Sequence, residues 1–153
     1  MKNPYQRKAA SKNQSSNIHP QESYKAFIES MLQNNGIYAL YQDGFALCAT
    51  PTGQKALAIW RHINLAKLVV KDNWANYQPM HLSFRDFIEK VLPHLNEEQT
   101  MVSLDLSPEG QNMLISPEKM LLDIKNYLYQ VYLQRPEIFE QLNIPLPRQI
   151  RLH

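Results

Sequence analysis

The chain has 153 residues, 44 % of them apolar, and a formal net charge of +2. This length suits one domain with a buried core, and no apolar run reaches the roughly 20 residues that cross a bilayer. The only cysteine, Cys48, excludes an intramolecular disulfide and a multi-cysteine zinc site, and it favours a cytoplasmic location.

The charge is unevenly distributed along the chain. Residues 1–20 contain four basic residues and no acidic one, and residues 143–153 contain two basic residues and no acidic one. Residues 21–142 therefore carry a net charge of −4. We expect a disordered basic tail over residues 1–20, a single α+β domain over residues 21–142, and a basic, Pro-containing tail over residues 143–153. An acidic body argues against a nucleic-acid groove on the domain itself.

The first expected element is a helix over residues 21–34. Its apolar residues recur at three- and four-residue spacing, which places them on one face. They are Tyr24, Phe27, Ile28, Met31 and Leu32. Asn35 and Gly36 follow, and both tolerate the left-handed conformation that ends helices.

Three strands are expected next, over residues 37–42, 45–50 and 55–60. Asp43 and Gly44 separate the first two, and this dipeptide is typical of two-residue hairpin turns. Consecutive strands with short turns predict an antiparallel meander, which two later strands could extend to a sheet of four to five strands.

Two helices are expected after the third strand. One covers residues 65–73 with Asn64 as its N-cap, and a loop that holds Trp74, Tyr77 and Pro79 follows it. The other covers residues 84–92, where Ser83 caps the first turn.

The last elements are two strands and a long helix. Strands are expected over residues 101–106 and 112–115. A helix then starts after Ser116 with Pro117 at its first position and runs to residue 134. Its predicted buried face holds Met120, Leu121, Ile124, Leu128, Val131 and Tyr132. One further helical turn is expected over residues 137–142. We therefore expect about four helices, apart from this turn, to pack on the sheet.

Residues 36–40, 43–46, Trp60 and the run Trp74-Ala-Asn-Tyr77-Gln-Pro79 together resemble a bacterial family of small proteins with a domain of unknown function. The resemblance covers about residues 23–130. It implies the element boundaries given above, and it supplies no catalytic or ligand-binding residue.

The best candidate site is the aromatic group Trp60, Trp74 and Tyr77. Such side chains can line a pocket for a ligand or partner, because they offer large contact areas at low entropic cost. They can equally fill the core where the strands meet the helices. Cys48 could act as a nucleophile if His62 or His81 lay beside it, but a buried, inert thiol is the simpler interpretation.

No other pattern indicates chemistry. The histidines His19, His62, His81, His94 and His153 have no metal-binding spacing, and each glycine is used by a turn, so no phosphate loop remains. We therefore expect a non-catalytic protein-binding or adaptor domain that uses no cofactor or metal.

The expected partner is another protein or a second copy of this chain, and no membrane. One alternative is a small-ligand-binding protein or enzyme with a pocket near Trp60, Trp74, Tyr77 and Cys48. A second alternative is nucleic-acid contact through Lys2, Arg7, Lys8 and Lys12 of the tail.

Overall fold

The computed structural model describes residues 20–152 and has the α+β architecture expected from the sequence. The predicted basic tail, apart from Pro20, lies outside the described residues. The elements in chain order are α1 (Pro20–Gln33), β1 (Ile37–Tyr41), β2 (Leu47–Ala49), β3 (Lys55–Ile59), α2 (Ile63–Lys67), η3 (Asp72–Trp74), β4 (Gln78–Leu82), α3 (Phe84–Asp86), η4 (Phe87–Val91), α4 (Leu92–Glu97), β5 (Met101–Leu104), β6 (Met113–Ile115), α5 (Pro117–Gln134), α6 (Glu137–Gln141) and η5 (Pro147–Gln149).

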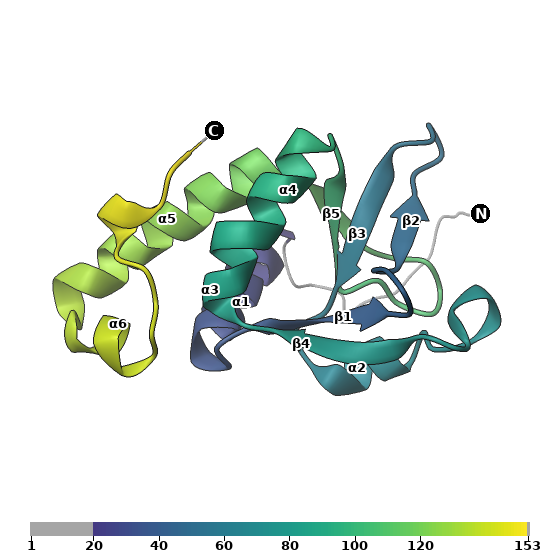
Figure 1. Cartoon of the computed structure of the whole chain (residues 1–153), viewed down its shortest axis with the longest axis horizontal. Coiled ribbons are helices and arrows are strands. Elements are labelled where there is room, and N and C mark those ends of the chain that lie inside the picture. Colours follow the sequence, from purple (N-terminus) through teal and green to yellow (C-terminus); the bar gives the residue numbers. More distant parts are fainter. Residues whose placement is uncertain (1–19, 153) are drawn as a thin grey trace, which may run out of the picture.

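The strands form two sheets instead of the single meander that the sequence predicts (Figure 1). One sheet has the order β2-β3-β5-β6, in which β3 and β5 run parallel, and the other pairs β1 with β4. β1 meets the next strand only at the bridge Tyr41–Phe45, and the chain reverses at Asp43, whose φ is +55°. Ala46 is where this segment changes partner. Its N–H donates to the Leu40 carbonyl of β1, whereas its carbonyl accepts from the Ala58 N–H of β3, and the residues that follow pair with β3.

The prediction of a loop around Pro79 is wrong, because Pro79 belongs to strand β4. Pro79 lies opposite Leu40 in an antiparallel ladder with β1. Ile37 and Ala39 of β1 are fully buried, so their backbone groups need hydrogen-bond partners. β4 supplies them from an edge position, where a proline that lacks an N–H is tolerated.

Two helices differ from their predicted extents. α2 runs only from Ile63 to Lys67, and after it the N–H groups of Leu68, Val69 and Val70 donate to carbonyls three residues back, as in tighter 3₁₀ turns. The helix that begins at Phe84 continues through Pro93 to the end of α4, since the wider π-helical turn of η4 leaves room for the proline ring. Two of the three predicted caps are present: Ser83 accepts from the Asp86 N–H at 3.1 Å, and Ser116 accepts from the Lys119 N–H. The prediction of Asn64 as a cap is wrong, because Asn64 lies inside α2 and the N-cap is His62.

The main core lies between one face of the larger sheet and the helices α1, η4, α4 and α5 (Figure 1). Leu57, Ile59 and Val102 of the sheet pack there. Tyr132, expected on the buried face of α5, is 42 % exposed, and its ring packs edge-on against Phe139. No helix among the described residues is long and apolar enough to cross a membrane.

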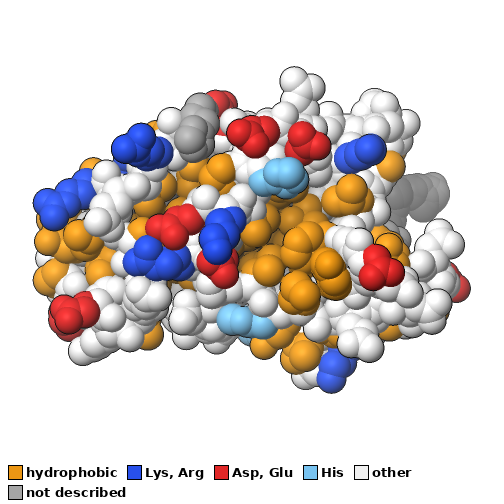
Figure 2. All heavy atoms as spheres, viewed as in Figure 1, with side chains coloured by type: hydrophobic (Ala, Val, Ile, Leu, Met, Phe, Trp, Pro, Cys, Tyr) orange, Lys and Arg blue, Asp and Glu red, His pale blue; other side chains and the backbone are white. Residues whose placement is uncertain are grey.

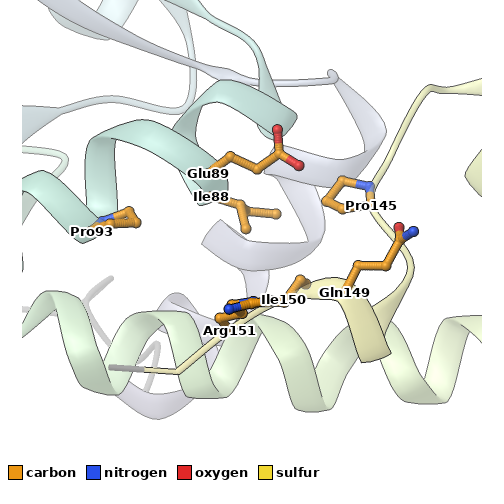
Figure 3. A pocket seen from close by; sticks show the side chains of 7 residues that line it. All are labelled: Ile88, Glu89, Pro93, Pro145, Gln149, Ile150 and Arg151. Carbon is orange, nitrogen blue, oxygen red and sulfur yellow. The ribbon is translucent and has the colours of Figure 1, made fainter.

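The predicted C-terminal tail packs against the body of the protein as far as Ile150. Ile144 and Ile150 are buried, and Lys125 donates a 2.8 Å hydrogen bond to the Ile150 carbonyl. A hollow of about 180 Å³ separates this segment from η4 (Figure 3). Glu89 at its rim already pairs with Arg85 at 2.9 Å. The hollow is therefore a narrow seam between packed elements.

Candidate functional site

The structure brings the three predicted aromatic residues together in a second, smaller core. Trp60 is fully buried, and its indole N–H donates a 2.8 Å hydrogen bond to the Leu106 carbonyl. Trp74 packs edge-on against Trp60, with 6.3 Å between ring centroids, and Tyr77 follows at 6.5 Å from Trp74. A fully buried indole cannot touch a partner, so Trp60 supports the surface from within.

Trp74 and Tyr77 are both half-buried, and they differ in what they face. Trp74 of η3 lines an open hollow beside strand β2, whereas Tyr77 does not line it. Of the three aromatic candidates, Trp74 is therefore the one placed to contact another molecule in that hollow.

Cys48 lies in the middle of β2 and is half-buried. Its thiol donates a weak 3.6 Å hydrogen bond to the carbonyl of Ala56 on β3. His81 belongs to the other sheet, where it packs edge-on against Tyr38. Among the described residues, no hydrogen bond joins a histidine to Cys48, so the geometry does not assemble a thiol–imidazole pair.

The outer edge of β2 is a feature that the sequence analysis did not single out. On its inner side, Ala46 accepts from Ala58 at 3.4 Å and Thr50 donates to Gln54 at 2.9 Å. Because hydrogen-bonded and non-bonded pairs alternate in an antiparallel ladder, the intervening odd-numbered residues direct their backbone groups away from β3.

Those outward-facing residues are Phe45, Leu47 and Ala49. Within residues 20–152, no hydrogen bond uses their N–H or C=O groups outside the β2–β3 ladder. Leu47 and Ala49 are exposed, Leu47 to 46 %. β2 is thus an edge strand with free backbone donors and acceptors, which are suited to pair with another extended chain.

Two hollows flank β2 and share Leu47. The first, of about 400 Å³, lies where β2 and β3 meet η4 and α4, and we call it the apolar groove. It is lined by Phe45, Leu47, Lys55, Leu57, Lys90, Val91, His94, Leu95, Glu98 and Thr100. Figure 2 shows hydrophobic side chains gathered on this face, with charged side chains and histidines around them.

The second hollow, of about 430 Å³, lies on the side of Trp74 and the loop at residues 106–110. Its lining includes all three residues of β2 together with polar groups such as Asp72 and Ser107. Among the described residues, no three His, Cys, Asp or Glu side chains lie close enough together to hold a metal ion. What the site offers is apolar surface beside a free strand edge.

The groove and the edge could not be identified from sequence patterns. Leu47 was predicted as part of a central strand of the meander, which would have had both edges paired. The one available signal was the absence of charge from Gly44 to Gln54, a run of neutral residues around an exposed strand.

The chain belongs to the family described as "Protein of unknown function (DUF2750)", whose model matches residues 24–124. The match covers more than half of the chain and includes strands β2 and β3 and the segment that holds Trp74. No curated protein and no solved structure matches the chain.

Proposed function

We propose that this chain is a non-catalytic protein-binding domain that takes an extended segment of another protein along the outer edge of β2. The observation that carries the proposal is the set of free backbone groups on Phe45, Leu47 and Ala49. Backbone hydrogen bonds supply affinity when a peptide adds to a sheet edge, and pockets for its side chains supply specificity.

The two hollows supply such pockets. Side chains of an added strand alternate between the two faces of the sheet. Those on one face would enter the apolar groove beside Leu47 and Leu95, and those on the other would lie toward Trp74. The bound segment is therefore expected to carry an apolar residue at the groove position.

The polar rim of the groove adds a further preference. Lys55, Lys90 and His94 stand on this rim, and Glu98 is its one acidic residue. Lys90 lies 3.5 Å from Asp86, which offsets part of its charge, whereas Lys55 forms no ion pair within the described residues. Residues that flank the apolar anchor are therefore expected to be neutral or acidic.

The setting we propose is the cytoplasm, where a single half-buried thiol stays reduced. The alternative of a small-molecule site uses the same Trp74 hollow. Ligand pockets usually bury most of their ligand's surface, and this hollow is open along β2. A segment of protein chain fits it better.

Photo-crosslinking in cells tests the proposal. A photoreactive residue at Leu47 is compared with one at Leu133, which is 76 % exposed on α5 and lies outside both hollows. We expect a protein crosslinked only from position 47, and we expect Ala49→Pro to abolish it, because the substitution removes one outward N–H at an edge where proline is tolerated. Equal products from both positions, or products insensitive to Ala49→Pro, would contradict strand addition at β2.

A further inference from the structure

We infer that the extended segment bound along β2 is the same segment of a second copy of this chain, so that two copies join edge to edge into one continuous sheet. The inference rests on the proposed function and names its partner. The segment concerned is Phe45 to Ala49, and the two-fold axis passes through Leu47.

The backbone of this segment is self-complementary. Its outward-facing residues stand at three alternate positions, with Leu47 at the centre. When a second copy is placed antiparallel, Leu47 exchanges both backbone hydrogen bonds with Leu47 of the second copy. Phe45 of each copy exchanges backbone hydrogen bonds with Ala49 of the other copy in the same way. Every free donor and acceptor on the edge then has a partner.

The side chains are complementary as well. Residues directly opposite each other in a sheet lie on the same face. Phe45 and Leu47 line the apolar groove. On that face Leu47 would meet Leu47 of the second copy, and Phe45 would meet Ala49 of the second copy. Leu47, 46 % exposed in the single chain, becomes covered, and Tyr41, which packs edge-on against Phe45 at 5.3 Å, extends the contact.

β2 is short, with three residues, but its edge carries neither the charged side chains nor the proline that commonly keep strands apart. Proteins commonly protect a free edge with charged side chains or proline within the strand. No charged residue occurs between Asp43 and Lys55, and Pro51 comes only after β2 ends. By contrast, β4, the edge of the smaller sheet, carries Pro79 and His81. A neutral apolar edge can lie against its own copy without repulsion between like charges.

This pairing has a functional consequence. The apolar grooves of the two copies would lie next to each other on one face of the joined sheet, and both edges would be occupied. A foreign segment can then bind only by displacing one copy. Self-pairing would set the threshold concentration for any other partner.

Mass measurement of the full chain across a range of concentrations tests the inference. We expect twice the 17.9 kDa of the single chain for the wild type and for the control Leu133→Lys. Ala49→Pro, which removes an outward N–H, and Leu47→Lys, which places like charges together at the axis, are expected to remain single chains. Circular dichroism melts confirm that each variant is folded.

A disulfide tests the register. Leu47→Cys combined with Cys48→Ala places two cysteines at a hydrogen-bonded pair, about 5.5 Å apart at Cα, within the usual range for a disulfide. Mild oxidation should then give a covalent dimer. Wild-type Cys48 should give much less, because it lies diagonal to Cys48 of the second copy at about 7–8 Å.

The outcomes separate this inference from the proposed function. A wild-type chain that stays single at every concentration overturns self-pairing, and so does a dimer that persists in both Ala49→Pro and Leu47→Lys. A dimer sensitive to both variants but bridged readily through wild-type Cys48 overturns the axis at Leu47. In each case, a different protein crosslinked from position 47 would still support strand addition at β2. If no protein is crosslinked from position 47 either, both the proposed function and self-pairing are contradicted.

Discussion

The hydroxyl of Tyr24 donates a 2.8 Å hydrogen bond to a carboxylate oxygen of Asp123, which joins the first helix to the last long helix. Asp123 also accepts from Lys119 at 2.9 Å. Burial, and then the hydrogen bond and charge of Asp123, raise the pKa of the Tyr24 hydroxyl well above its ordinary value. The neutral hydroxyl is therefore part of the folded structure.

Tyr24→Phe should lower the free energy of unfolding by about 1 kcal/mol at neutral pH, the usual net value of one hydrogen bond. Because the folded pKa is raised, the stabilisation by Tyr24 is fully present below the unfolded pKa near 10 and declines as the pH rises above it. The difference between wild type and variant should therefore shrink at alkaline pH. Denaturant melts at neutral and alkaline pH measure this, with the exposed Tyr129→Phe as control. A difference that grows with pH would contradict the assignment.

Gly36→Ala should destabilise the fold by about 2–3 kcal/mol, the upper part of the range for overpacking. A Cβ at this position, where φ is +142°, would overlap the carbonyl oxygen of Leu82 and the ring of His81. Gly53→Ala is the matched control, because φ there is +87° and nothing lies within 4 Å of the added Cβ. It should cost about 1 kcal/mol from backbone strain alone. Equal losses in thermal melts would show that β4 does not approach Gly36 closely.

Trp60→Ala and Trp74→Ala should differ in their effects. Trp60 is fully buried and bonded to Leu106, so its removal should cost about 3–5 kcal/mol. Trp74 is half-buried at the rim of a hollow, so its removal should cost about half as much. Chemical denaturation of both variants measures the difference. If both cost the same, Trp74 is a core residue and not part of the surface beside β2.

The ion pair of Arg61 and Asp105 connects the ends of the parallel strands β3 and β5. One carboxylate oxygen accepts from the Arg61 backbone N–H at 3.1 Å, and the other lies 2.7 Å from its Nε. Asp105→Ala should cost about 2 kcal/mol, because both side chains are about three-quarters buried and a backbone donor loses its partner. Asp86→Ala, which removes an exposed pair at 3.5 Å, should cost under about 0.5 kcal/mol. A similar loss for both in urea melts would show that the strand-end pair is only a surface contact.

Much of the secondary structure could be predicted because its signals are local. Ser116 and Pro117 mark the start of α5, and Asn35 with φ of +50° ends α1 before Gly36. Each signal acts through hydrogen bonds and backbone conformations within a few residues. The rings of Trp60, Trp74 and Tyr77 do lie together, whereas the sequence left open whether they fill the core or face outward.

The sequence by itself determined the fold class, the long helices and their caps, since these depend on hydrophobic spacing and on neighbouring residues. Tertiary structure alone decided that β1 pairs with β4, that β3 runs parallel to β5, and that the helix continues through Pro93. It also decided that β2 is an edge. Strand partners are selected by burial and by the hydrogen-bond needs of the whole core, which couple residues far apart in the chain. These long-range strand pairings leave the outer side of β2 without a neighbouring strand among the described residues, and the apolar groove beside Leu47 stays open there.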